Sequence, residues 1–431
     1  MNALRASWLC LASLGIGASA LAAPPPPFRG LGLLAGTDEC GEDAVSSDGS
    51  VVVGECAPDD RSTIQPYRWD AVHGQRALDL PKDMTECYTL SLSADGSIAA
   101  GVCDSFTTDP GAFRWDGTLH AQSLGSLTGK SICVAAGLSF DGSVAIGDCR
   151  AGDSDREAFR WDAVNGMQGI GILAGTEQSL AGAVTPDGAV IVGESDSADY
   201  STTKAFRWDA GNGLQDLGSL PGLPNCSAST VSEDGSIVVG TCKSSNGASA
   251  EAFRWDAASG MHDLGVPPGK TRSYGYFASG DGAVVIGDSY TSGGAEEAFR
   301  WDAAGGITGL GLLPGLDSCY LTSASGDGSI AAGICRDTSG QQQEQVFVWD
   351  AQNGIRKLQD VIESNGNDLS GWQITYPTLP SGGVAFAGTG LHMGHYEAWV
   401  APEATASGDA VAALASLALL ARRRWPPRAS T

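Results

Sequence analysis

The stretch CGEDAVSSDGSVVVGEC, residues 40–56, begins and ends on a cysteine and holds an Asp-Gly midway between them. Asp-Gly between two short apolar runs favours a tight β-hairpin, because glycine adopts a positive φ at little steric cost. Residues equidistant from such a turn face each other across the two strands, and their Cβ atoms come close to the reach of a disulfide. The stretch therefore predicts a hairpin closed by a disulfide.

The same arrangement recurs along the chain. Five pairs of cysteines, each 16 residues apart and centred on an Asp-Gly, are predicted disulfides: Cys40 with Cys56, Cys87 with Cys103, Cys133 with Cys149, Cys226 with Cys242, and Cys319 with Cys335. In two further units both cysteines are replaced together, by Ser179 with Ser195 and by Ser273 with Ser289. Loss of both partners at once is expected of bonded pairs. Oxidised pairs indicate export, and two sulfurs without a nearby histidine do not suit a metal.

Three sequence markers repeat together every 46 or 47 residues. A Leu/Gly-rich segment such as LGSLPG at 217 opens each unit, and an aromatic-Arg-Trp-Asp segment such as FRWD at 206 closes it. The Asp-Gly between them occurs at Asp48, Asp95, Asp141, Asp187, Asp234, Asp281 and Asp327. A weaker eighth unit has LQDVIES at 358, PSGGVAFAG around Gly382 and EAWV at 397. Equal spacing over about 370 residues indicates a repeat array.

Each unit breaks into four short predicted strands. In the fourth unit they lie at 167–173, 180–186, 189–195 and 204–210. Four strands per repeat, with no helical pattern in any unit, are typical of a β-propeller blade. We therefore expect an all-β chain that forms a β-propeller of eight four-stranded blades, with seven as the alternative if the eighth unit is irregular. The recurring tryptophan is expected to pack between the blades.

The ends of the chain determine how the ring closes. The predicted strand at 30–36 belongs to the type that opens a unit, whereas the last unit, at 372–400, ends on the type that closes one. The N-terminal strand is therefore expected to complete the final blade and to close the ring.

The two termini also carry predicted targeting segments around the repeats at 30–401. Residues 1–22 have Arg5, an apolar run and small residues before Ala22, as in a secretory signal peptide, and residues 23–29 form a Pro-rich leader. Residues 402–431 hold an apolar segment followed by Arg422, Arg423 and Arg424. This tail resembles bacterial PEP-CTERM-type sorting signals, which implies a membrane contact before processing, with the arginines on the cytoplasmic side. A core helix at the end of the last domain is the alternative.

The repeats resemble the extracellular HAF-repeat family of bacteria. The resemblance rests on DGSVVVG, on AFRWDA and on the closing segment at 368–401, and it covers about residues 28–401. It implies a secreted or surface repeat protein, a propeller fold, and no catalytic residue that could be carried over.

The charge of the chain restricts its partners. Asp and Glu number 50 against 25 Lys and Arg, a formal net charge of −25. Such a chain is not expected to bind nucleic acid or an anionic membrane surface, because both need clustered basic residues. Binding residues are more often found on variable loops. The acidic loops offer a candidate ligand or Ca²⁺ surface at Asp59, Asp60, Asp104, Asp109, Asp153, Asp155, Asp196 and Asp199, with a solvated acidic rim as the alternative.

Catalytic motifs are missing from the sequence. It has no nucleophile elbow, zinc-protease motif, P-loop or dinucleotide fingerprint, and its one close histidine pair is His392 with His395. We therefore predict no catalytic residue, no dedicated metal site and no required cofactor. The expected function is an exported, non-enzymatic binding or scaffold module at the cell surface, outer membrane or matrix, with a polysaccharide or surface protein as partner. The alternatives are a glycan-active hydrolase or lyase that uses paired carboxylates, and a structural surface-layer component.

Overall fold

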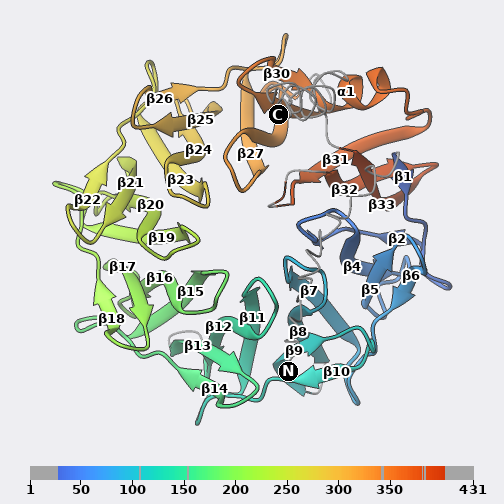
Figure 1. Cartoon of the computed structure of the whole chain (residues 1–431), viewed down its shortest axis with the longest axis horizontal. Helices are drawn as coiled ribbons and strands as arrows, with labels where there is room; N and C mark the ends of the chain where they lie inside the picture. Colours follow the sequence, from blue (N-terminus) through green and yellow to red (C-terminus); the bar gives the residue numbers. More distant parts are fainter. Residues whose placement is uncertain are drawn as a thin grey trace, which may run out of the picture.

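A computed structural model describes residues 28–402 apart from 106–107, 153–154, 341–343, 381 and 383–384. Eight antiparallel sheets are arranged as the blades of a β-propeller around a central channel, so the expected all-β fold is confirmed and the blade number is eight, not seven (Figure 1). The predicted signal peptide and C-terminal tail lie outside these residues. Within them, no helix is long and apolar enough to cross a bilayer.

The strands of each blade follow one another from the channel outward. Blade 1 contains β2 (Glu39–Cys40) with β3 (Ala44–Val45), β4 (Val51–Ala57), β5 (Gln65–Asp70) and β6 (Gly74–Ala77); blade 2 contains β7 (Glu86–Leu92), β8 (Ala99–Ser105), β9 (Thr108–Trp115) and β10 (Ala121–Ser123). Blade 3 contains β11 (Ile132–Leu138), β12 (Val144–Arg150), β13 (Arg156–Asp162) and β14 (Gly166–Gly169); blade 4 contains β15 (Gln178–Val184), β16 (Val190–Asp196), β17 (Thr203–Asp209) and β18 (Gly213–Asp216).

The second half of the ring repeats this order. Blade 5 contains β19 (Asn225–Val231), β20 (Ile237–Lys243), β21 (Ala250–Asp256) and β22 (Gly260–Asp263); blade 6 contains β23 (Arg272–Ala278), β24 (Val284–Tyr290), β25 (Glu296–Asp302) and β26 (Gly306–Gly309). Blade 7 contains β27 (Ser318–Ala324), β28 (Ile330–Arg336), β29 (Gln345–Asp350) and β30 (Gly354–Lys357); blade 8 contains β31 (Trp372–Thr378), β32 (Ala385–His392), β33 (His395–Pro402) and β1 (Arg29–Gly30).

The antiparallel order gives the ring two different faces. The Asp-Gly turn between the first two strands and the turn before the outermost strand lie on one face, which we call the turn face. The loop between the second and third strands and the connection to the next blade lie on the other, which we call the loop face. The predicted acidic loops all belong to the loop face.

All five predicted disulfides are present, and each joins the first two strands of one blade with Cα atoms 3.9–4.1 Å apart. The sulfurs lie in the contact between neighbouring blades: Cys226 and Cys242 pack with Val192 of blade 4. In blade 4 the serine pair takes this place through hydrogen bonds, because Ser179 Oγ accepts from the Ala158 amide of blade 3 at 2.9 Å. Five disulfides indicate an exported, non-cytoplasmic protein.

The Asp-Gly turn also joins each blade to the one before it. Arg207 of blade 4 donates from Nε to the carbonyl oxygen of Gly235 in blade 5 at 3.1 Å, and Arg160 and Arg254 repeat this contact one blade earlier and later. Gly235 has a φ of 71°, and an added Cβ would lie 2.6 Å from Cγ2 of Val190 in blade 4. This glycine is therefore required by the close packing of two blades as well as by the turn.

The ring closes as expected, by antiparallel pairing of the N-terminal strand with the last strand. Arg29 pairs with Val400 and Gly30 with Trp399. Phe28 lies edge-on to Trp372, with ring centroids 5.2 Å apart, and the Gly32 amide donates to Glu397 Oε1 at 2.7 Å. Backbone pairing, aromatic packing and a charge-assisted hydrogen bond together hold the first residues of the ring against the last blade.

Two details of the predicted strands are wrong. The segments predicted at 30–36 and 167–173 form strands only over Arg29–Gly30 and Gly166–Gly169. Gly32 and Gly171 have φ values of 81° and 90°, which take the chain out of the extended conformation. Of the apolar residues that follow, Leu33 and Ile172 are exposed, Leu34 is half-buried and Leu173 is buried between blades, and none of them is part of a strand.

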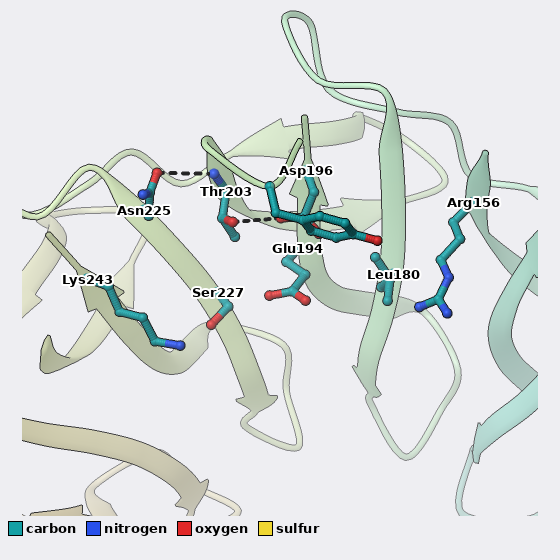
Figure 2. Close-up of a pocket in the computed structure, with 9 residues that line it drawn as sticks. Arg156, Leu180, Glu194, Asp196, Thr203, Asn225, Ser227 and Lys243 are labelled. Atoms are coloured by element: carbon teal, nitrogen blue, oxygen red, sulfur yellow. Dashed lines mark hydrogen bonds between the residues drawn. The ribbon is translucent and has the colours of Figure 1, made fainter. Parts of the chain in front are cut away.

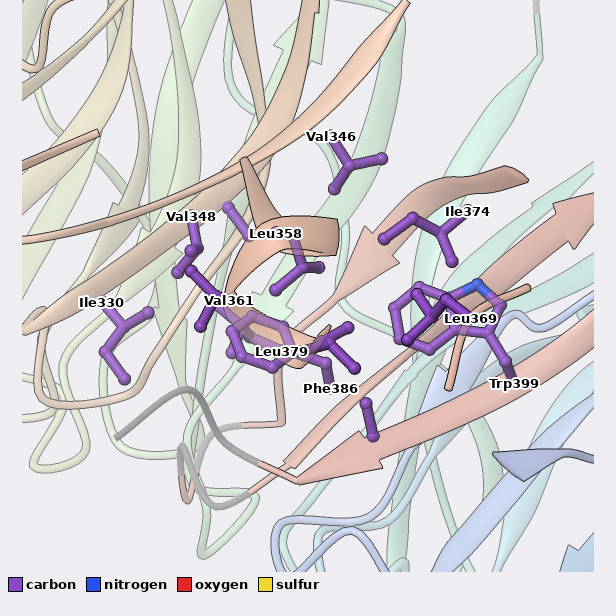
Figure 3. Close-up of a cluster of buried hydrophobic side chains, with 13 residues drawn as sticks. Ile330, Val346, Val348, Leu358, Val361, Leu369, Ile374, Leu379, Phe386 and Trp399 are labelled. Carbon is purple, nitrogen blue, oxygen red and sulfur yellow. The ribbon is translucent and has the colours of Figure 1, made fainter. Parts of the chain in front are cut away.

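The prediction that no unit contains a helix is also wrong at one place. LQDVIES forms α1 (Leu358–Ser364), where Leu358, Val361 and Ile362 are buried. Their spacing of three and four residues places them on one helical face. This face packs into the core between blades 7 and 8, beside Trp399 and Phe386 (Figure 3). The helix therefore contributes apolar side chains to the core beside the irregular eighth blade.

The contact between the turn and the preceding blade can be tested with two glycines of similar φ. Gly235→Ala should destabilise the protein by about 2–4 kcal/mol, because it combines a strained φ with overpacking against Val190. Gly247, in an exposed loop with a φ of 69° and no atom near an added Cβ, is the matched control. Gly247→Ala should cost only about 1 kcal/mol. Denaturant unfolding measures both, and equal losses would contradict the assigned contact.

Candidate functional site

The predicted acidic loop residues do not form one surface. They lie on the loop face of blades 1, 2, 3 and 4, and Asp153 falls outside the described residues. Asp60 and Asp199 accept the amides of Ser62 and Ser201 and so stabilise their own turns. Among the residues that the structure describes, no group of three or more His, Cys, Asp or Glu side chains is placed to hold a metal ion.

The remaining members of this set differ in their surroundings. Asp59 and Asp109 are exposed, and Asp155 forms an ion pair with Lys130. Burial and the facing carboxylate of Glu86 raise the pKa of Asp104. Asp196, in contrast, lies in a pocket.

This pocket has a volume of about 310 Å³ and opens on the loop face where blades 3, 4 and 5 meet (Figure 2). That volume is at the lower end of the range for small-molecule sites. The walls are contributed by Arg156 of β13, Leu180 of β15, Glu194 and Asp196 of β16, Tyr200 and Thr203 beside and in β17, Asn225 and Ser227 of β19, and Lys243 of β20. We call it the blade 4–5 pocket.

Two carboxyl groups form the centre of the pocket. Glu194 and Asp196 are two residues apart on β16, so both side chains lie on the same face of the sheet. Asp196 is 2% exposed and accepts a hydrogen bond of 2.7 Å from Thr203 Oγ1. Burial raises the pKa of both carboxyl groups; Asp196 further raises the pKa of Glu194, and Lys243 lowers it. Glu194 is the more accessible acid.

Positive groups lie on opposite walls of the pocket. Arg156 Nε is 3.8 Å from Asp148 Oδ2 and has no hydrogen-bond partner. Lys243 Nζ lies 5.7 Å from the ring centroid of Tyr274, over its face. Figure 2 shows the Glu194 carboxyl between these two cations. The pocket therefore offers both donors and acceptors to a polar ligand.

The loop that covers this pocket is held by local contacts. Tyr200 has a φ of 57°, and its hydroxyl lies 3.4 Å from Gln178 Oε1. The Thr203 amide donates to Asn225 Oδ1 of the next blade at 3.2 Å. An exposed aromatic ring thus stands beside the polar pocket, and blade 5 fixes the end of the loop.

The mouth of the channel on the turn face is a second cavity, of about 470 Å³. Asp281 and Asp327 line it, but each accepts a serine hydroxyl of its own turn, from Ser279 at 2.6 Å and Ser325 at 2.7 Å. These hydrogen bonds help to lower the pKa of both carboxyl groups. Their oxygens are already used in the turns, which makes this cavity the weaker candidate for a site.

A third group of carboxyls lies inside blade 1. Thr378 of blade 8 donates to Glu42 at 3.1 Å, and Thr89 of blade 2 donates to Asp43 at 2.7 Å. Burial and the neighbouring carboxyl of Asp43 raise the pKa of Glu42 to about 8. Burial, the hydrogen bond with Asp43 and the nearby acidic groups raise that of Glu55 to about 10. These carboxyl groups join blades 8, 1 and 2, and burial favours their neutral form.

Comparisons with known proteins bear on the fold alone. No family model and no curated protein matches the chain. A prolyl endopeptidase structure matches at a TM-score of 0.54 and 10% identity, over 83% of this chain and 55% of that chain. Oligogalacturonate lyase from Vibrio parahaemolyticus matches at a TM-score of 0.47 and 13% identity, over 82% of this chain and 97% of that chain. TolB from Acinetobacter baumannii matches at a TM-score of 0.39 and 14% identity, over 73% of this chain and 84% of that chain. The first of these supports the propeller scaffold.

Sequence reasoning identified Asp196 but missed most of its neighbours. Arg156, Glu194 and Lys243 belong to three different blades and stand in ordinary strand positions of the repeat. The carboxyls of blade 1 could have been found by comparing units, because Thr89 and Leu90 occupy in blade 2 the places of Glu42 and Asp43.

The carboxyls of blade 1 predict how stability depends on pH. The folded chain keeps the Glu42 proton up to about pH 8, whereas the unfolded chain releases it near pH 4.5. The unfolded state therefore binds fewer protons in this window, and the free energy of unfolding falls as pH rises from 5 to 8. Glu42→Gln should reduce this fall by roughly 1–3 kcal/mol. Urea unfolding at several pH values measures it, and an unchanged slope would contradict the assignment.

Proposed function

We propose that the protein is an exported, non-enzymatic binding module that holds extracellular polysaccharide in the blade 4–5 pocket, as a scaffold at the cell surface, outer membrane or matrix. The observation that carries the proposal is the convergence of Glu194, Arg156 and Lys243 on a concave site beside Tyr200. Sugar hydroxyls both donate and accept hydrogen bonds, so they need a site of this mixed kind. The likeness to HAF repeats and to sorting tails supports a surface location.

The neighbouring carboxyls favour glycan hydrolysis or cleavage as the second candidate function. Two acids with raised pKa values on one face of a strand can divide acid and base roles. The accessibility of the two groups argues for binding instead, because Asp196 is 2% exposed and bonded to Thr203. A second carboxyl that cannot reach the ligand leaves Glu194 without a catalytic partner.

A combined binding and product assay tests the proposal. The full oxidised chain is titrated with a panel of polysaccharides, with and without Ca²⁺, while reducing ends and unsaturated products are measured. We expect saturable binding without product, and a loss of affinity of at least fivefold in Glu194→Gln. Glu363→Gln, on the exposed side of α1, is the control and should bind as the wild type does.

The other outcomes separate the alternatives. Product formation that Glu194→Gln abolishes would establish the enzyme and contradict a binding module. Self-assembly of the chain without affinity for any polysaccharide would support the surface-layer role. A dependence of binding on Ca²⁺ that is lost in Asp59→Asn or Asp104→Asn would move the site to the predicted acidic loops.

A further inference from the structure

We infer that the blade 4–5 pocket is selective for acidic saccharides, and that Arg156 binds the ring carboxylate of a hexuronic acid unit while Glu194 accepts its hydroxyls. This inference rests on the proposed function and specifies the ligand of the same site. The juxtaposition that carries it is a pair of cations on opposite walls of a carboxyl-containing pocket in a chain of net charge −25.

The basic residues of this chain are mostly used within the fold. Ion pairs at 3.3 Å or less engage eleven Arg and Lys side chains of the described residues: Arg61, Arg76, Lys130, Arg160, Lys204, Arg207, Arg254, Lys270, Arg300, Arg336 and Arg356. Arg156 has its carboxylate neighbour at 3.8 Å, and Lys243 contacts an aromatic ring. Two cations with spare donor capacity therefore meet at one pocket.

The chemistry of Arg156 suits a carboxylate. A guanidinium presents a planar set of donors that matches two carboxylate oxygens, and it stays charged at any physiological pH. The Arg156 side chain is 27% exposed, so part of its guanidinium can reach a ligand oxygen, and its Nε makes no hydrogen bond within the fold. The carboxylate of Asp148 lies 3.8 Å from Arg156 Nε, which is too far for a hydrogen bond.

The acids of the pocket set the orientation of the ligand. A ligand carboxylate placed beside Glu194 would be repelled, so we expect the anionic group at the Arg156 wall, where the cation also lowers the pKa of Asp196, and the hydroxyls at the centre. Lys243 on the far wall adds positive potential and lies next to Ser227, which offers a further hydroxyl (Figure 2). A neutral sugar could bind only at the centre of the pocket, whereas an acidic sugar could bind both at the centre and at the Arg156 wall. This difference predicts selectivity for the acidic form.

Matched ligands test the inference. Oligosaccharides of alginate, polygalacturonate and hyaluronate are compared with their carboxyl-reduced forms, in which each carboxylate becomes a primary alcohol. The full oxidised wild-type chain should bind at least one acidic oligosaccharide about tenfold more tightly than its reduced form at low salt. Arg156→Gln should abolish this preference, because it should weaken binding of the acidic form about tenfold more than binding of the reduced form. Arg156→Lys should retain part of the preference, since charge remains and the planar donor pair is lost.

The outcomes separate failure of this inference from failure of the proposed function. Glu363→Gln should keep the full preference for the acidic form. Should Arg156→Gln fail to fold, Lys243→Met is the second variant: it leaves Arg156 in place, removes the cation on the far wall, and should reduce the preference. Equal binding of the acidic and reduced forms by the wild type would overturn the inference and leave the proposed function standing. Absence of binding to either form would overturn both. Dextran sulfate binding as tight as uronate binding would contradict planar carboxylate recognition.

Discussion

The contact on which the ring depends is the one between the Asp-Gly turn of each blade and the sheet of the blade before it. The turn glycine packs against the preceding blade, as Gly235 does on Val190 at the start of its second strand. At four junctions the turn carbonyl also accepts a hydrogen bond from the arginine of the aromatic-Arg-Trp-Asp segment: Arg68, Arg160, Arg207 and Arg254. One repeat cannot bury its own apolar face, so neighbouring repeats must supply the second half of each core. The two most regular sequence markers are the two partners of this contact.

The disulfides, which lie towards the loop face, and the ring closure are further contacts that hold the ring together. The sulfur atoms and their serine replacements lie between blades, so the hairpin that each disulfide holds is also an interface. At the closure, Phe28 packs against Trp372 and Trp399, and Gly49 keeps the regular contact through its close approach to Ala385 of blade 8. With both faces of every sheet engaged in packing, the loops between the second and third strands are the part of the repeat that is free to vary. The blade 4–5 pocket is formed beside one of these loops.

The sequence was sufficient to predict the features that repeat from unit to unit. Eight copies of one spacing gave the blade number, the disulfide register and the closing strand. It failed where a unit departs from the pattern: LQDVIES became α1 because three apolar residues recur at helical spacing, and the strand at 30–36 ends early because Gly32 turns the chain. The pocket was mostly missed, because Arg156, Glu194 and Lys243 come together only through the packing of three blades.

We propose that the ligand binds on the loop face between blades 4 and 5. Hydrogen–deuterium exchange of the full oxidised chain, with and without a saturating acidic oligosaccharide, tests it most directly. We predict slower exchange at 194–203 and at 225–227, in the loop and strand ends around Glu194, and unchanged exchange at the Asp-Gly turns. Protection confined to the turn face, around Ser279 and Asp281, or protection at neither place, would contradict the claim.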